Sequence, residues 1–184
     1  MAISNQDLIK FAYAWAQKEV DTYGTRPPFF LPFEKGQVLA KQLNANADVV
    51  SLGALLMDIK LLEALHLKKA PEHIKMGVAA SRDFLRSYGA EPKLIDAVIH
   101  CIEAHHGTIP YQSIEAEICA NADCYKFLTT KNWLNFFAAT NDEEPGYAEQ
   151  KFNEKVGVLS LQLCKEELAP HISAIKKIVA LSKK

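Results

Sequence analysis

Apolar residues recur at helical spacing along almost the whole chain, and no segment alternates apolar and polar residues as a half-buried strand would. The first helical pattern begins after Ser4, which forms a capping-box-like start with Asp7, and it ends at Gly24. The prolines and phenylalanines of residues 24–33 exclude a regular helix there and are too apolar for a free linker. The pattern predicts an all-α protein, a helical bundle.

Helical patterning resumes near Glu34 and weakens at residues 44–48, where Asn46 or Asp48 lies near the start of a new helix. That helix, residues 49–65, is apolar almost all round, which is typical of a central element. Proline and glycine mark the next two helices, since prolines are favoured in a first turn and glycines after a last turn. We expect these two helices between Pro71 and Gly89 and between Pro92 and Gly107, and further helices at about 113–128, near Trp133, from Pro145 to about Glu167 and after Pro170.

Length and charge narrow the class of protein. A chain of 184 residues without internal repeats or linkers fits one domain, residues 1–184. Its 21 basic and 22 acidic residues are spread evenly, so neither nucleic acid nor a membrane surface is an expected partner. Four cysteines without a CxxC pair, no leader segment and no membrane-length apolar run favour a cytoplasmic protein.

Ionisable residues interrupt the apolar stripes at four places, and such groups are costly to bury unless they are paired or bind a metal. Each alone has an ordinary explanation, such as a helix cap, an ion pair or a hydrogen bond to a carbonyl. Together, two carboxylates and two or three imidazoles form a nitrogen and oxygen ligand set suited to Mn, Fe, Zn, Ni or Mg. These residues are Asp58, His73, the pair His105 and His106, and Asp123.

The order of these residues resembles the HD-domain superfamily of metal-dependent phosphohydrolases, over about residues 36–128, with flanking helices on both sides. The segments that carry the resemblance are ADVVSLGALLMDIK, HIKMGVAASRDFLRSYG, LIDAVIHCIEAHHG and EAEICANADCYKFL. The resemblance implies that Asp58 is the aspartate of the His-Asp pair and that Asp123 is the late aspartate. It also implies that His73, with His105 or His106, corresponds to the additional histidines of two-metal members.

The chain departs from the family pattern at two ligand positions. Met57 replaces the histidine of the His-Asp pair, and a thioether is a poor ligand for a hard divalent ion. The first histidine of the family has no counterpart, because the matching position falls near Pro28 or, with a shorter spacing, at Glu34. The resemblance therefore implies one divalent ion rather than two, or none, and we expect Met57 to line the pocket at the substituted ligand position.

Three functions remain open. The first is a phosphohydrolase that acts on a nucleotide or another small phosphate ester, with one ion held by Asp58, His73, His105 and Asp123. In such a phosphohydrolase, His106 would be the general acid or base. The second is an inactive HD-like domain that binds a nucleotide or a protein partner without turnover. The third is a buried polar network in a protein that acts through its surface alone.

Two further expectations concern phosphate and self-association. Lys60, with Lys75 or Arg26 as alternatives, could hold a phosphate group, and nothing in the sequence selects among them. An exposed part of the aromatic segment 133–137 could serve a homodimer interface.

Overall fold

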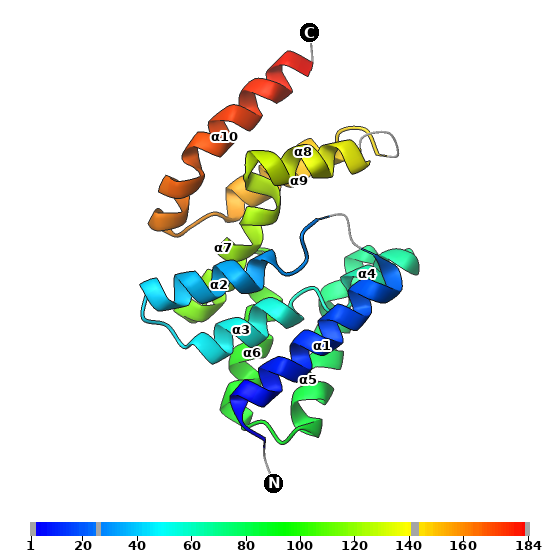
Figure 1. Cartoon of the computed structure of the whole chain (residues 1–184), viewed down its shortest axis with the longest axis vertical. Coiled ribbons are helices and arrows are strands. Elements are labelled where there is room, and N and C mark those ends of the chain that lie inside the picture. The colour runs from blue at the N-terminus through cyan, green and yellow to red at the C-terminus, as the bar shows by residue number, and fades with distance from the viewer. Residues whose placement is uncertain (1–2, 25–26, 141–143, 183–184) are drawn as a thin grey trace.

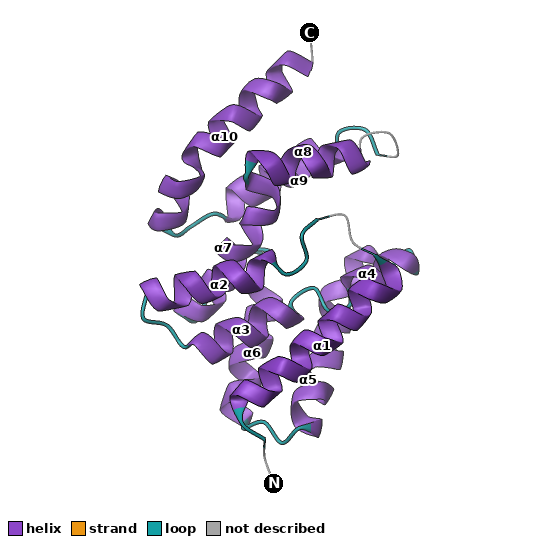
Figure 2. Cartoon of the chain, viewed as in Figure 1, coloured by secondary structure: helices purple, strands orange, loops and turns teal. Residues whose placement is uncertain are grey.

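The computed structural model describes residues 3–24, 27–140 and 144–182. Within these residues the chain is helical throughout and contains no strand, which confirms the predicted all-α class (Figures 1 and 2). The helices are α1 (Asn5–Tyr23), α2 (Leu31–Gln42), α3 (Ala47–Leu56), α4 (Leu61–His66), the 3-10 turn η1 (Ala70–Glu72), α5 (His73–Ser87), α6 (Pro92–Ala104), α7 (Ile114–Leu128), α8 (Thr130–Thr140), α9 (Tyr147–Val158) and α10 (Gln162–Ser182).

Local sequence sets several helix ends where they were predicted. Ser4, Asn46 and Ser113 cap α1, α3 and α7, and the side chain of each accepts a backbone N–H from the first turn. Gly24 follows α1 with a φ of 72°, a conformation that residues with a Cβ rarely adopt. These ends follow from interactions within a few residues, so the sequence pattern predicts them well.

Helices α3 and α7 form the centre of the molecule. Every residue of α3 from Val49 to Leu56 is buried, and α7 packs against α2, α3, α6, α8, α9 and α10. Gly53 allows a close approach of three helices, since a Cβ there would lie 2.7 Å from Cβ of Cys101 and 2.9 Å from Sγ of Cys119. The predicted central element is confirmed, and it supplies a rigid base for the residues that follow it.

The predicted helix over residues 49–65 is interrupted, and the interruption positions Asp58. Helix α3 ends at Leu56 and α4 begins at Leu61, with turn-type hydrogen bonds between them. Asp58 therefore lies in a turn at the end of α3, although it is only 6% exposed. The apolar pattern continues across this turn because both helices face the core, which is why periodicity alone predicts one long helix.

The predicted helix from Pro145 to about Glu167 is also divided, and the prediction that a last helix begins after Pro170 is wrong. The chain leaves helix at residues 159–161, where Oδ1 of Asn121 accepts the N–H groups of Ser160 and Leu161, each at 3.0 Å. This contact with α7 satisfies backbone groups outside a helix, and a single-segment pattern cannot anticipate it. Helix α10 then runs through Pro170.

The four cysteines are all buried as free thiols. None of the helices that the structure describes combines the length and the apolar character needed to cross a bilayer.

Candidate metal centre

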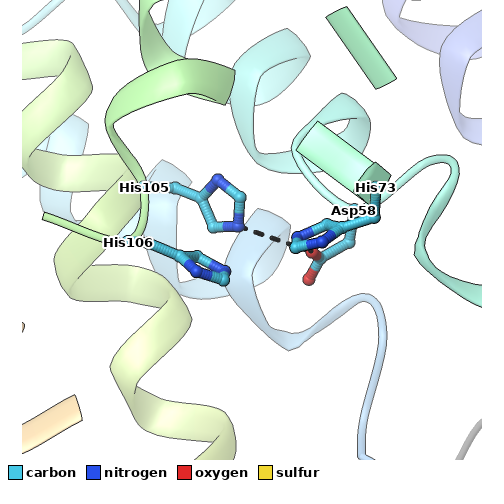
Figure 3. Close-up of side chains that lie close together, drawn as sticks. All are labelled: Asp58, His73, His105 and His106. Atoms are coloured by element: carbon cyan, nitrogen blue, oxygen red, sulfur yellow. Dashed lines mark ion pairs between the residues drawn. The ribbon is translucent and has the colours of Figure 1, made fainter. Parts of the chain in front are cut away.

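Four ionisable side chains from three separate parts of the chain meet at one end of the core. Asp58 comes from the turn after α3, His73 from the first residue of α5, and His105 and His106 from the end of α6. One potential ligand atom of each lies within 4.8 Å of those of the others (Figure 3). The structure thus brings together the residues that the sequence singled out on the first three helices of the resemblance.

The tautomers of two histidines follow from their backbone contacts. Nδ1 of His73 lies 2.7 Å from the carbonyl oxygen of Ala70, and Nδ1 of His105 lies 2.6 Å from that of Ile102. A carbonyl oxygen only accepts hydrogen bonds, so each Nδ1 carries the proton and donates it. In its neutral form each ring therefore presents an unprotonated Nε2, which is the usual arrangement of a metal-binding histidine.

Both Nε2 atoms point toward the same carboxylate oxygen. Oδ1 of Asp58 lies 3.5 Å from Nε2 of His105 and 3.9 Å from Nε2 of His73. The 3.9 Å separation is too long for a hydrogen bond and the 3.5 Å one is at its limit, and both Nε2 atoms are buried without a hydrogen-bond partner. Three atoms with lone pairs therefore face one another in a buried space.

Burial favours the neutral form of His73 and His106. It is the largest influence on His73 and lowers the pKa of that ring. Burial, together with the nearby His105, lowers the pKa of His106 to about 2. A ring with such a low pKa is a weak base at neutral pH but keeps a lone pair available to a cation.

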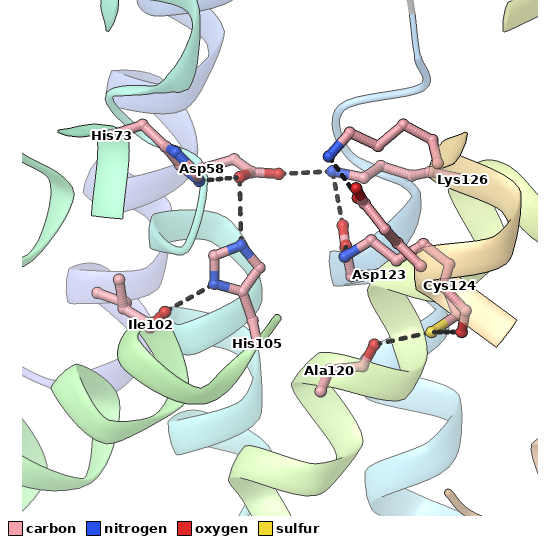
Figure 4. A network of polar contacts seen from close by, with 11 residues as sticks. Asp58, His73, Ile102, His105, Ala120, Asp123, Cys124 and Lys126 are labelled. Atoms are coloured by element: carbon pink, nitrogen blue, oxygen red, sulfur yellow. Dashed lines mark hydrogen bonds and ion pairs between the residues drawn. The ribbon is translucent and has the colours of Figure 1, made fainter. Parts of the chain in front are cut away.

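The other side of Asp58 contacts lysine rather than histidine. Nζ of Lys126 donates to Oδ2 of Asp58 at 2.5 Å and lies 2.6 Å from Oδ1 of Asp123 (Figure 4). Lys155 forms an ion pair with the other oxygen of Asp123. Burial is the largest single influence on both carboxylates and disfavours their charge. The pKa of each aspartate is nevertheless held below its usual range, that of Asp58 by Lys126 and His105 together and that of Asp123 by Lys126 and Lys155 together. The same pairing raises the pKa of Lys126 despite its burial.

These groups open onto one pocket of about 880 Å³. Asp58, His73, His106 and Asp123 all line it, so the predicted convergence on one pocket is confirmed. Its remaining wall is largely apolar or aromatic and includes Leu61, Leu62, Leu65, Phe127, Phe136 and Tyr147. Among the residues that the structure describes, the lysines that line it are Lys126, Lys151 and Lys155. A pocket of this size and mixed lining is typical of a small-molecule site.

The donor set suits a transition metal. Three imidazole nitrogens and one carboxylate oxygen match the ligands of Zn, Fe, Ni or Mn sites in proteins. The two buried Nε2 atoms without partners are the observation that makes the fit, because a buried nitrogen acceptor without a partner is costly. Asp58, His73, His105 and His106 are therefore the residues that could hold an ion.

Other residues predicted for the site lie elsewhere. Lys60 pairs with Glu19 at 3.0 Å and with Glu63 at 2.7 Å, and neither Lys60 nor the exposed Lys75 lines the pocket. Arg26 lies outside the described residues. The roles assigned to these residues from the sequence stay predictions.

The substituted ligand positions differ in where they lie. Near Pro28, the neighbouring Pro27 and Phe29 line the pocket, whereas Met57 does not. Met57 is 1% exposed in the hydrophobic core and is not among the lining residues, so the prediction that it lines the pocket is wrong. The Met57 side chain belongs to the hydrophobic core, whereas the carboxylate of the next residue, Asp58, lies beside His73 and His105. Glu34 is exposed on α2.

Lys126 and Lys155 are site residues that the sequence reasoning missed. One signal was available, because Lys126 follows Asp123 by three residues in a helix that is otherwise buried from Ile118 to Leu128. A lysine on such a helix requires a buried partner. Lys155 carries no comparable signal, since its partner lies on another helix.

No protein-family model matches the chain. Over 86 residues, 47% of this chain, the sequence is 35% identical to ribonuclease Y of Finegoldia magna and 34% identical to ribonuclease Y of Symbiobacterium thermophilum. The matched segment is only 15% of the length of each ribonuclease. The structure is similar to the crystal structure of a predicted HD superfamily hydrolase from an uncultured Thermotogales bacterium. The TM-score is 0.56 and the identity 14%, over 96% of this chain and 90% of that one. The chain has the fold of that protein, and the resemblance predicted from the sequence motifs is confirmed.

Proposed function

We propose that this protein is a phosphohydrolase that uses a single divalent metal ion and acts on a nucleotide or another small phosphate ester. The observation that carries the proposal is the pair of buried Nε2 atoms, on His73 and His105, that face Oδ1 of Asp58 without hydrogen-bond partners. A polar network built for stability alone would satisfy these atoms.

The ligands we assign to the ion are Asp58, His73, His105 and His106. When bound, the ion would supply Lewis acidity, polarising a phosphate oxygen and activating water. The backbone carbonyls of Ala70 and Ile102 hold two of the rings in the tautomer that ligation needs. With a pKa of about 2, His106 is better suited to be a ligand than the general acid or base that the sequence suggested.

The pocket supports a phosphate ester as the ligand. Three lysines border it, and the carboxylates of Asp58 and Asp123 neutralise two of them, Lys126 and Lys155. Lys151 is partly exposed and pairs with Glu154 at 2.7 Å, so it is the lysine best placed to approach an anion. The aromatic side chains Phe127, Phe136 and Tyr147 offer a wall against which a base or another planar group could stack.

One observation favours the second candidate function, an inactive domain that binds a phosphate compound or a protein partner. Lys126 holds Oδ2 of Asp58, and both oxygens of Asp123 are paired with lysines. Of the four carboxylate oxygens of Asp58 and Asp123, three therefore contact lysines, and Oδ1 of Asp58 is left to bind a metal. A test of the proposal must therefore measure metal binding and turnover separately.

The experiment begins with protein purified without chelator and without a metal-binding tag. Its metal content is measured, and hydrolysis is then assayed with added manganese or nickel against nucleoside monophosphates, an aryl phosphate and a short RNA. The RNA is included because the relatives by sequence are named ribonucleases. We expect about one ion per chain, as a single donor cluster implies, and turnover that EDTA abolishes.

His105→Gln should lose both the ion and the turnover, while the exposed His171→Gln on α10 should keep both. A bound ion without turnover of any substrate would favour the inactive domain. Protein that neither contains nor takes up an ion would contradict the proposed function.

A further inference from the structure

We propose that the ammonium group of Lys126 is a built-in cation that takes the place of a second metal ion between Asp58 and Asp123. The inference extends the proposed function, on which it rests, by stating why the site holds one ion. Lys126 is then a positioning residue, because it acts on the metal site through Asp58.

The position of the lysine is the first argument. Asp58 lies in the turn after α3 and Asp123 on α7, and the two side chains reach the same nitrogen from different elements. Nζ of Lys126 lies 2.5 Å from Oδ2 of Asp58 and 2.6 Å from Oδ1 of Asp123. Protein oxygen ligands lie at about 2.0 to 2.6 Å from magnesium or calcium. The ammonium nitrogen thus occupies nearly the point that an ion shared by these two oxygens would occupy.

The balance of charge is the second argument. Asp58, Asp123, Lys126 and Lys155 are each at most 6% exposed, so their charges interact with little screening by water. Two carboxylates that face each other in such a place are unstable without a cation between them. Lys126 supplies that cation and Lys155 covers the far oxygen of Asp123, so the four charges cancel.

The two oxygens of Asp58 divide the site into two halves. Oδ1 faces the imidazoles of His73 and His105, whereas Oδ2 binds Lys126, as Figure 4 shows. One carboxylate therefore lies between a metal position on the histidine side and a lysine on the other side. The contact with Lys126 also fixes the rotation of the carboxylate, so that Oδ1 points at the histidines before any ion arrives.

The test compares the number of metal ions bound per chain in the parent protein and in a variant that lacks the Lys126 ammonium group. The parent and Lys126→Ala are dialysed against manganese, the bound ion is counted, and the electron paramagnetic resonance spectrum is recorded. We expect one ion with an isolated-ion spectrum in the parent. In Lys126→Ala we expect two ions with the spectrum of a coupled pair, because Asp58 then bridges them. Asp123→Asn added to Lys126→Ala should return the count to one.

Lys151→Ala is the matched control, since Lys151 also lines the pocket but pairs with Glu154 rather than with the two aspartates. Its ion count should equal that of the parent. A second ion in Lys151→Ala would mean that any loss of positive charge from the pocket recruits an ion, and would overturn the inference.

The outcomes separate this inference from the proposed function. Two ions in the parent, or an unchanged count of one in Lys126→Ala, would overturn the role of Lys126 and leave the proposed function standing. No ion in the parent would overturn the proposed function. In that case the role of Lys126 would be supported only if Lys126→Ala bound an ion and the double variant with Asp123→Asn did not. Any other result would contradict the role of Lys126 as well. If Lys126→Ala does not fold, the parent decides, because one ion supports the inference and two or none contradict it.

Discussion

Oδ1 of Asp58 and Nε2 of His105 face each other across 3.5 Å, although one belongs to the turn after α3 and the other to the end of α6. His105 is fully buried, and its proton is held at Nδ1 by the carbonyl of Ile102. Two lone pairs directed at each other in a buried space are unfavourable unless a cation or a proton lies between them. Several measurable properties of the protein depend on this relationship.

His105→Gln should remove the stabilisation that a divalent ion gives. An ion at a hundred times its dissociation constant stabilises a protein by about 2.7 kcal/mol, so the parent should unfold at a higher temperature with manganese than with EDTA. The variant should show no such difference. Thermal unfolding of both proteins with and without manganese is the measurement, and a full manganese response in the variant would exclude His105 as a ligand.

The metal-free protein should lose stability as the pH falls below about 6.5, the ordinary histidine value. Burial lowers the folded-state pKa of His73, and lowers that of His106 to about 2. Below pH 6.5 the unfolded chain therefore binds protons that the folded protein does not, so protonation favours unfolding. The stability is complete above that pH.

Urea unfolding in EDTA at a series of pH values would measure this effect. The contribution of His106 should be at most about 1.4 kcal/mol for each pH unit below 6.5. His106→Gln should make the dependence shallower, and an identical slope in parent and variant would contradict the prediction.

Asp58→Ala should destabilise the metal-free protein by about 1 to 3 kcal/mol, because it removes one of the two carboxylates that Lys126 contacts. In a Lys126→Met background the same change should cost less or even stabilise, since it then removes repulsion between Asp58 and Asp123. Urea unfolding of the parent, both single variants and the double variant gives the coupling energy. Additive effects would show that Asp58 and Lys126 do not depend on each other.

Gly53→Ala should destabilise the protein by about 1 to 3 kcal/mol through overpacking. The new Cβ would lie 2.7 Å from Cβ of Cys101, on a neighbouring helix that cannot move freely. Gly157→Ala near the end of α9 is the control, since nothing lies within 4 Å of its Cβ position. That change should be neutral or stabilise slightly, by up to about 1 kcal/mol. Equal unfolding midpoints for the two variants would contradict the close packing of α3.

The sequence by itself determined the helical class, most helix ends and most of the candidate metal ligands. Caps such as Ser4 and Asn46 act within one turn, and an apolar stripe with period 3.6 has few alternatives to a helix. The histidines could be recognised because a buried ionisable group must have a partner. This argument requires only that the histidines are buried, and the pattern of apolar residues around them predicts that burial.

Only the tertiary structure decided which groups became partners. The turn that directs Asp58 into the pocket is hidden in an unbroken apolar pattern. The break at Ser160 depends on a hydrogen bond that its N–H donates to Asn121 on a helix distant in sequence. Asp123 was grouped with the histidines because it interrupts an apolar helix face and matches the late aspartate of the resemblance, but it pairs with Lys126 and Lys155. Electrostatic interactions fall off with distance in space rather than along the chain, so their partners are fixed only when helices that are remote in sequence pack together.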